Sequence, residues 1–327
     1  MEASGLWHLV KFESPCLTGD SLTHFDQGRY LTSLTTEMNL ENDSSGGPTV
    51  GVHPNAWNLG IGVITLVIVA VALFTVLWFA LTGSQNGVIT KTVAFPVGVV
   101  DSSEPSSMAP PGAHALKGYK LNYVTDFNGT TIPQGWYSFS GVPGGLPGGH
   151  FAKSHVVVNH GLLQLNTWRD PRFHNHWVTG GLCQCGLGHA YQAYFVRSRI
   201  TGAGTNEVEL LWPLKNNWPP EVDFNETGAH ADQTSSTVHW GIDNHIEQIT
   251  LKVNMKRWHT WGVIWSPASI IYTVDGRQWG SITNPVEIPR QPMRLDFEQR
   301  TNCPIKQDCA TRPVSMQIDW VAEYAPR

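Results

Sequence analysis

The sequence predicts an all-β domain, a sandwich or a barrel, over Tyr119–Arg327. Short runs of alternating residue types recur through this region, and Gly- and Pro-rich turns separate them. No long amphipathic helix pattern interrupts them, and Asp275-Gly276 is a typical hairpin turn. Many short strands of this kind are typical of a sandwich or a barrel. The candidate strands are His155–Asn159, Leu162–Trp168, Ala190–Ile200, Ile249–Val253, Thr260–Trp265 and Ile270–Val274.

An apolar segment without charges precedes this domain. Leu59–Leu81 has 23 residues and, at about 1.5 Å per residue, is long enough to cross a bilayer. Trp57 and Trp78 lie near its ends, where interfacial aromatic residues are usual. A cleaved signal peptide fits poorly, because the apolar run is too long and no basic region precedes it. We therefore predict one transmembrane helix that acts as a signal anchor.

The segments on either side of this helix are polar. Met1–Asn58 is rich in Ser, Thr and Gly and shows no sustained periodicity, so we predict a disordered tail. Residues 82–118 contain Pro110-Pro111 and a stretch rich in Ser, and we predict a flexible linker. The predicted organisation is therefore tail 1–58, membrane helix 59–81, linker 82–118 and the β-rich domain over 119–327.

The charge and the cysteines limit the function classes. A net charge of −5 without a basic stripe argues against nucleic acid as a partner. Four of the five Cys lie in the domain, and an even number there suits an oxidising compartment. Cys303 and Cys309 could close a short loop, whereas Cys183 and Cys185 would form a strained ring. Crossed pairs between the two segments are equally open. The spacing matches no standard zinc ligand set, so we expect no metal.

The most informative stretch is Glu221-Val222-Asp223-Phe224-Asn225-Glu226, which reads as a strand with three acids. Side chains alternate along a strand, so Glu221 and Asp223 share a face and Glu226 should point the other way. One extra residue inserted as a β-bulge would return Glu226 to their face. Cleavage of a glycosidic bond with retention needs such an arrangement, because one carboxylate attacks while a second carboxyl donates a proton. A solvent-exposed acidic strand is the plainer alternative.

The surrounding residues favour the catalytic interpretation. Trp218-Pro219-Pro220 come directly before the acids, and Pro is common at the first residue of a strand. Eleven of the 14 Trp fall in the domain; we expect most in the core and a few along a groove, where an indole can stack on a sugar ring.

The segment resembles the active-site strand of glycoside hydrolase family 16, whose pattern is Glu, aliphatic, Asp, apolar, an optional extra residue, then Glu. The resemblance extends over Tyr119–Arg327 and includes Trp258-His259-Thr260-Trp261, Val274-Asp275-Gly276 and Gln291-Pro292-Met293-Arg294-Leu295. The longer spacing is similar to that of the laminarinase-type branch, although Asn225 stands where an apolar residue is usual. The resemblance implies a concanavalin-like β-jelly-roll sandwich with a concave substrate groove. It implies no required cofactor. Some members carry a structural calcium, which no residue here places.

The resemblance assigns roles to the three acids. Glu221 would be the ionised nucleophile, Glu226 the protonated acid and later the base, and Asp223 would hydrogen-bond Glu221. Crowding should raise the pKa of one of these carboxyls. The predicted substrate-binding residues are Trp212, Trp218, His239 and Arg197. Arg197 matches an arginine on a groove strand of the family.

These observations predict a retaining endo-hydrolase of β-linked polysaccharide, with β-1,3-glucan as the first candidate. A transglycosylase on the same fold and a non-catalytic lectin are the alternatives. A lectin would have no need for three acids. Because polymeric β-glycans lie outside cells, we expect a single-pass plasma-membrane protein with its domain outside, although the flanking charges do not set this orientation. We expect a monomer whose partners are the polysaccharide and the membrane.

Overall fold

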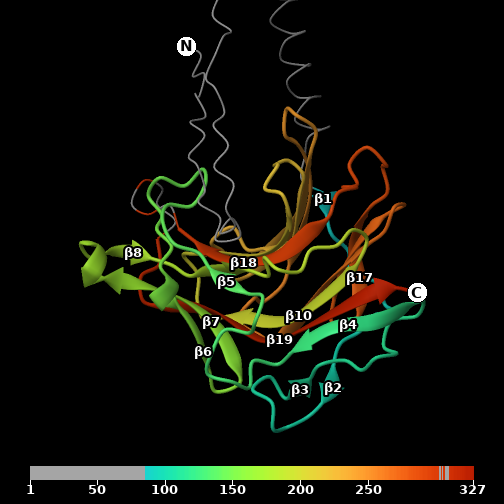
Figure 1. Ribbon diagram of the computed structural model, residues 1–327, viewed down its shortest axis with the longest axis horizontal. Coiled ribbons are helices and arrows are strands. Elements are labelled where there is room, and N and C mark those ends of the chain that lie inside the picture. The colour runs from blue at the N-terminus through green and yellow to red at the C-terminus, as the bar shows by residue number, and fades with distance from the viewer. Residues whose placement is uncertain (1–84, 302, 304, 306–308) are drawn as a thin grey trace, which may run out of the picture. The chain divides into compact units, whose positions relative to one another are not determined.

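The computed structural model describes residues 85–301, 303, 305 and 309–327. Two large β-sheets lie face to face over most of this range (Figure 1). The all-β sandwich predicted from the sequence is therefore confirmed. The predicted tail and membrane helix lie outside the described residues, and within those residues no helix is long and apolar enough to span a bilayer.

The first sheet has eight strands and carries the acidic segment. In spatial order its strands are β1 (Gln85–Asn86), β14 (His245–Lys252), β13 (Gln233–Trp240), β12 (Glu221–Glu226), β11 (Asn206–Pro213), β18 (Met293–Arg300), β9 (Gly181–Cys183) and β5 (Tyr137–Ser138). Strand β1 pairs with β14 in parallel, and the other pairs of this sheet are antiparallel.

The second sheet has nine strands and backs the first. Its main order is β17 (Arg277–Ile282), β16 (Ile270–Val274), β15 (His259–Trp265), β10 (Ala193–Ile200), β19 (Val314–Pro326), β7 (Leu162–Asp170) and β6 (Val156–Asn159), with β4 (Tyr119–Thr125) on β19 and β8 (His176–Val178) on β7. Strands β2 (Val99–Val100) and β3 (Met108–Ala109) pair separately. Two 3₁₀ turns, η2 (Lys153–His155) and η3 (Pro171–Phe173), are also present within the described residues.

The main core lies between the two sheets. Alternate residues of each strand enter it, as strand geometry requires. From the first sheet these include Val222, Phe224 and Phe297, and from the second Trp261 and Trp265, all fully buried. Six of the eleven domain Trp are buried, as expected for most of them: Trp136, Trp177, Trp261, Trp265, Trp279 and Trp320.

The segment before Tyr119 differs from the prediction. Residues 85–118 do not form a flexible linker: Gln85–Asn86 form β1 of the eight-stranded sheet, and the segment from Phe95 to Leu116 packs on the outer face of the nine-stranded sheet. There Leu116 and Phe95 join an apolar cluster with Phe195, Trp320 and Tyr324. The indole of Trp320 donates to the carbonyl of Met108 at 2.8 Å, and the Tyr324 hydroxyl donates to that of Gly112 at 2.8 Å. An apolar sheet face needs such a cover, so the folded domain begins well before residue 119.

The structure also decides the cysteine pairing that the sequence left open. Cys183 pairs with Cys185, and Cys303 pairs with Cys309. Both bonds are local, so neither joins the two cysteine segments. The pairing of Cys183 with Cys185, which we had considered strained, is the one found, with Cα atoms 5.0 Å apart at the end of β9.

Candidate active site

The three acids of β12 lie on one face because the strand contains a β-bulge. Glu221, Asp223 and Glu226 oppose three positions of β13, which follow in the order His239, Thr237 and Ser235. These partners alternate along β13 and therefore share one face. The pairing shifts between Asp223 and Glu226, where β12 has one more residue than its neighbour. The bulge predicted from the sequence is thus present.

The remaining residues of β12 explain how the bulge is held. Val222 and Phe224 are fully buried in the core, on the side opposite to the acids. Asn225 is 2% exposed, and its Oδ1 accepts a hydrogen bond of 2.6 Å from the Thr234 hydroxyl on β13. The polar side chain at this usually apolar position therefore ties the bulge to the adjacent strand.

Glu221 and Asp223 are buried carboxyls, and burial disfavours their ionised forms. Burial, followed by the charge of Asp223, raises the pKa of Glu221 to about 8. Burial and the nearby Glu226 also raise the pKa of Asp223. These two carboxyls interact strongly, so they lose their protons as a pair rather than independently.

His239 faces this pair from β13. Its Nε2 lies 3.4 Å from Oδ2 of Asp223. Burial opposes the charged imidazole, but the hydrogen bond to Asp223 and the charges of both acids outweigh it and raise the pKa of His239 to about 9. We had expected Asp223 to hydrogen-bond Glu221, whereas the contact that the structure gives Asp223 is with His239. A cationic imidazole beside two carboxyls follows from this arrangement.

Two tryptophans surround Glu221 on the other side. The indole Nε1 of Trp218 donates to Oε2 of Glu221 at 2.7 Å. The Trp218 ring is stacked with Trp212 at a centroid distance of 6.4 Å and an angle of 14°, and 42% of the residue is exposed. An adjoining depression is lined by Trp218, Pro219, Pro220, Trp240, Ile242 and Ile288. Trp212, Trp218 and His239, all predicted to bind substrate, therefore gather around Glu221.

The fourth predicted binding residue, Arg197, lies elsewhere. It belongs to β10 in the nine-stranded sheet and is 7% exposed. Its Nε donates to the Ser106 hydroxyl at 3.2 Å, and its Nη1 lies 3.7 Å from Oδ1 of Asp275. Arg197 therefore anchors the segment over the outer face of that sheet and does not line the acid-bearing face.

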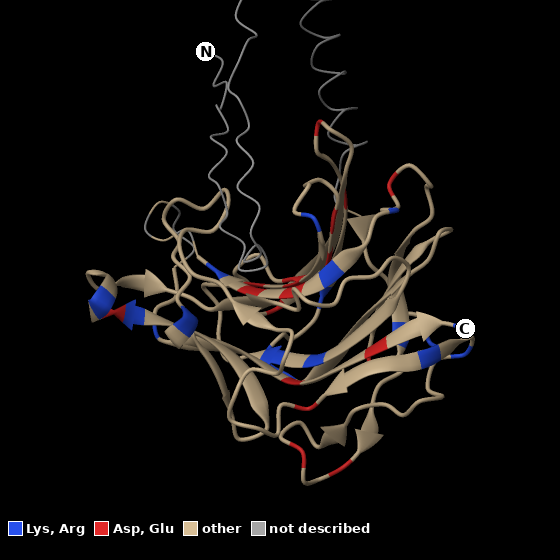
Figure 2. Ribbon diagram, viewed as in Figure 1, with Lys and Arg blue, Asp and Glu red and all other residues tan. Residues whose placement is uncertain are grey.

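Strand β18 adds charges to the acid-bearing face that sequence reasoning missed: Arg294, Asp296, Glu298 and Arg300. They lie opposite alternate residues of β11, which in turn pairs with β12. Figure 2 shows the acidic residues along this sheet. Arg294 Nε donates to Oδ1 of Asp296 at 3.0 Å, yet burial raises the pKa of Asp296 to about 7. The charges recur at every second position of Met293–Arg300, a strand period that could have revealed them.

A metal ion is one further use to consider for these groups. Among the described residues, Glu221, Asp223 and His239 each offer a ligand atom within 4.8 Å of the others. Both ring nitrogens of His239 are already engaged, because Nε2 faces Asp223 and Nδ1 lies 2.9 Å from Oδ1 of Asn244. The donor set therefore fits an ion pair between protein groups better than a metal centre.

Comparison with known proteins agrees with this geometry. Paired carboxyls are the groups that cleavage of a glycosidic bond uses. The family model described as Glycosyl hydrolases family 16 matches residues 191–322, which include β12 and β18. This match covers the part of the domain that carries the three acids, and the fold agrees with it. No curated protein matched the chain.

Solved structures share the fold at low sequence identity. The laminarinase from Rhodothermus marinus is 19% identical with a TM-score of 0.56, and the match covers 63% of this chain and 97% of that one. The laminarinase catalytic domain from Thermotoga maritima is 15% identical with a TM-score of 0.55, and the match covers 64% of this chain and 100% of that one. SCLam, a non-specific endo-β-1,3(4)-glucanase from family GH16, is 17% identical with a TM-score of 0.57, and the match covers 72% of this chain and 98% of that one. These similarities establish the fold, a two-sheet β-sandwich of the kind found in these glucanases.

Proposed function

We propose that the domain is a retaining endo-glycoside hydrolase that cleaves β-linked polysaccharide, with β-1,3-glucan as the substrate. The observation that carries the proposal is the bulge that brings Glu221, Asp223 and Glu226 to one face. The names of the similar laminarinases support β-1,3-glucan as the substrate. The stacked Trp212 and Trp218 provide a flat surface for a sugar ring beside Glu221.

The proposed reaction has two displacements. In the first, a carboxylate oxygen of Glu221 forms a bond to the anomeric carbon while the bond to the leaving oxygen breaks, and Glu226 gives its proton to that oxygen. In the second, Glu226 takes a proton from water, whose oxygen attacks the same carbon and releases Glu221. Two inversions give net retention, and Glu226 ends protonated as it began.

Glu221 must be ionised to attack, and its buried setting opposes this. The raised pKa of Glu221 differs from the ionised state that we expected from the sequence. The charges of His239 and Arg300 and the hydrogen bond from Trp218 all lower the pKa of Glu221 and so favour the reactive form. His239 and Trp218 therefore serve the reaction by partly offsetting the cost of a buried negative charge.

This role of His239 leads to a prediction for the pH profile. His239→Asn removes the positive charge and should raise the pKa of Glu221 further. The acid limb of kcat/KM should then move upward by about one pH unit, because more alkaline solution is needed to ionise the nucleophile. Profiles of the two proteins would be compared with His176→Asn, which changes an exposed imidazole on β8. An acid limb that stays in place in His239→Asn would contradict this role.

The proposed activity is tested with the full chain on laminarin, lichenan, agarose and xyloglucan. We expect new reducing ends to appear fastest on laminarin, and NMR of the first products to show the β-anomer. Products lengthened by a labelled acceptor oligosaccharide would indicate the transglycosylase instead. Binding to a glycan without any cleavage would indicate the lectin and overturn the proposal.

We also propose that the domain acts outside the cell, held at the plasma membrane by Leu59–Leu81. This segment lies outside the described residues. Its charge-free length and the extracellular location of polymeric β-glycans support the proposal. Fractionation of cells and protease treatment of intact cells would test it; a domain that is protected in intact cells would contradict it.

A further inference from the structure

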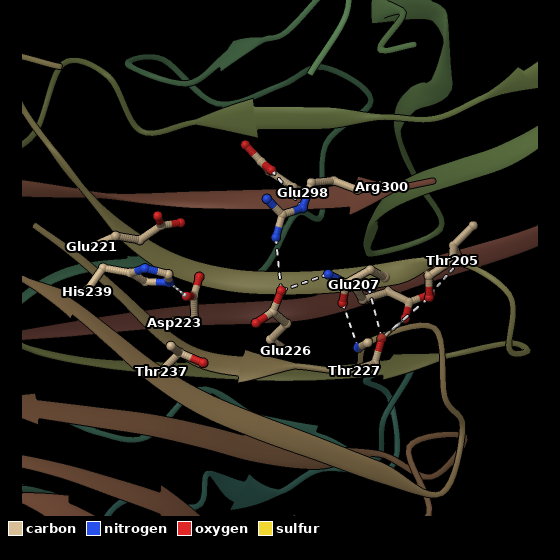
Figure 3. A network of polar contacts seen from close by, with 12 residues as sticks. Thr205, Glu207, Glu221, Asp223, Glu226, Thr227, Thr237, His239, Glu298 and Arg300 are labelled. Atoms are coloured by element: carbon tan, nitrogen blue, oxygen red, sulfur yellow. Dashed lines mark hydrogen bonds and ion pairs between the residues drawn. The ribbon is translucent and has the colours of Figure 1, made fainter. Parts of the chain in front are cut away.

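Glu226 is held from two sides, and both contacts reach the same carboxylate oxygen. Arg300 Nη2 donates to Oε1 at 3.0 Å, and Asn206 Nδ2 donates to Oε1 at 2.8 Å (Figure 3). The two donors are direct partners across β11 and β18. Neither contact involves Oε2, which Figure 3 shows on the side of Asp223. The two oxygens of Glu226 are therefore not equivalent.

Both donors are themselves fixed in position. Asn206 Oδ1 accepts a hydrogen bond of 2.7 Å from the backbone N–H of Gly228, which turns the amide so that its NH₂ group faces Glu226. Arg300 Nε lies 3.3 Å from Oε2 of Glu298. Burial opposes the charge of Arg300, but Glu298 and Glu226 outweigh this and raise its pKa. Arg300 therefore stays a cation at any pH at which the protein is folded.

This geometry decides where a proton on Glu226 can reside. An oxygen that already accepts hydrogen bonds from a guanidinium and an amide has no favourable place for a further proton. We infer that Arg300 and Asn206 are positioning residues that confine the acidic proton of Glu226 to Oε2 and direct it along the face that carries Glu221. The inference rests on the proposed function, because it concerns the proton that Glu226 gives to the leaving oxygen.

The charged groups around Glu226 come from three strands. Asp223 shares β12, Arg300 and Glu298 lie on β18, and His239 lies beyond Asp223 on β13. Asn206 is uncharged. Arg300 is thus a cation in direct contact with Glu226. A second variant, Asn206→Asp, tests the other donor and keeps the shape of the Asn206 side chain. The new carboxylate still accepts from Gly228, but it would attract the proton of Glu226 to Oε1 and away from the side that faces Asp223.

The test uses two aryl β-glycosides of one sugar, with phenyl and dinitrophenyl leaving groups, and full-length Arg300→Gln and Asn206→Asp. Dinitrophenolate leaves without protonation, so its release does not depend on the acid. Removing the Arg300 charge also affects ionisation of Glu221, which both substrates need, so the ratio of the two rates is the readout. We expect kcat/KM on the phenyl glycoside to fall by roughly 10–100-fold more than that on the dinitrophenyl glycoside. Because the sugar is the same, a change in sugar binding would affect both alike, and equal losses would overturn the inference.

Three companion variants keep the outcomes distinct. Glu226→Ala should show the same selectivity with a larger loss, about 10²–10⁴-fold. If Glu226→Ala does not distinguish the leaving groups, the proposed function fails, whereas selectivity in Glu226→Ala but not in the positioning variants overturns only the inference. Arg199→Gln removes a guanidinium that pairs with Gln317 on the second sheet and should show no selectivity. If Arg300→Gln does not fold, Arg300→Lys and Asn206→Asp carry the test.

Discussion

Glu221→Gln is expected to lower kcat for glycan cleavage by roughly 10⁴-fold or more, because an amide cannot replace a carboxylate as the nucleophile. The variant should fold, since glutamine has nearly the same shape and its amide oxygen can still accept from the Trp218 indole. It also removes the repulsion between Glu221 and Asp223, which contributes to the raised pKa of Glu221. Release of reducing ends would be measured beside thermal melting, and near-normal cleavage by the folded variant would refute the assignment.

Azide distinguishes the roles of the two glutamates. In Glu221→Gly, azide would attack the anomeric carbon directly, opposite to the leaving group, and give a glycosyl azide of inverted configuration. In Glu226→Ala, azide would instead attack the covalent intermediate on Glu221 and give the retained configuration. An activated aryl glycoside makes both reactions observable. If the two configurations appear with the residues exchanged, the nucleophile and the acid have been assigned in reverse.

The second large effect is expected at Glu209, which lies behind the bulge and between the two sheets. Its Oε1 accepts a hydrogen bond of 2.5 Å from the Ser198 hydroxyl on β10, and on β12 it pairs with Asn225. Burial raises the pKa of Glu209 to about 8, although hydrogen bonds from Ser198 and Asn225 lower it in part. The neutral carboxyl is therefore the form that the folded protein favours at neutral pH.

The raised pKa makes folding stability depend on pH. Glu209 contributes stability that is complete below its unfolded pKa of about 4.5 and is lost as pH rises through about 8, because the folded form retains the proton more strongly. Glu209→Gln resembles the neutral form at all pH values. We expect the variant and the parent to have about the same free energy of unfolding at pH 5. At pH 9 the free energy of unfolding of the variant should be higher by roughly a few kcal/mol.

Chemical denaturation at pH 5, 7 and 9 would measure this difference. Other buried carboxyls, including Glu207 and Glu323 with pKa values raised to about 7, are common to both proteins and cancel in the comparison. Asp243→Asn, a change at an exposed turn, serves as the control for removing one carboxylate. Parallel stability curves for Glu209→Gln and the parent would show that Glu209 is not the group responsible.

The local features of the site could be predicted from the sequence. The bulge follows from the spacing of Asp223 and Glu226 together with the need to keep Phe224 in the core, and all of this information lies within six residues. Trp212 and Trp218 were chosen as substrate-binding candidates for the same reason, since both lie just before that segment, and the structure places them beside Glu221. Features encoded in one strand and its two ends are therefore accessible without a structure.

The features that depend on distant pairing were not accessible. Arg300 reaches Glu226 only because β18 pairs with β11, whose sequence lies about 90 residues earlier. Arg197 has the right residue type on a predicted strand, but it lies on the outer face of β10, where it contacts Ser106 of the preceding segment that covers this face. That cover was itself hidden, because a Ser- and Pro-rich composition masks the few apolar residues, such as Phe95 and Leu116, that attach it.

The apolar cover of the second sheet also determines how the protein should be shortened for study. A recombinant fragment that starts at Tyr119 would leave Phe195, Trp320 and Tyr324 without Phe95 and Leu116 above them. Such a fragment would carry a water-exposed hydrophobic patch and tend to aggregate, even though every proposed catalytic residue is present. A fragment that starts at residue 85 keeps this patch covered by Phe95 and Leu116. It is therefore a better choice than the Tyr119 fragment when a shortened protein is needed for assays in solution.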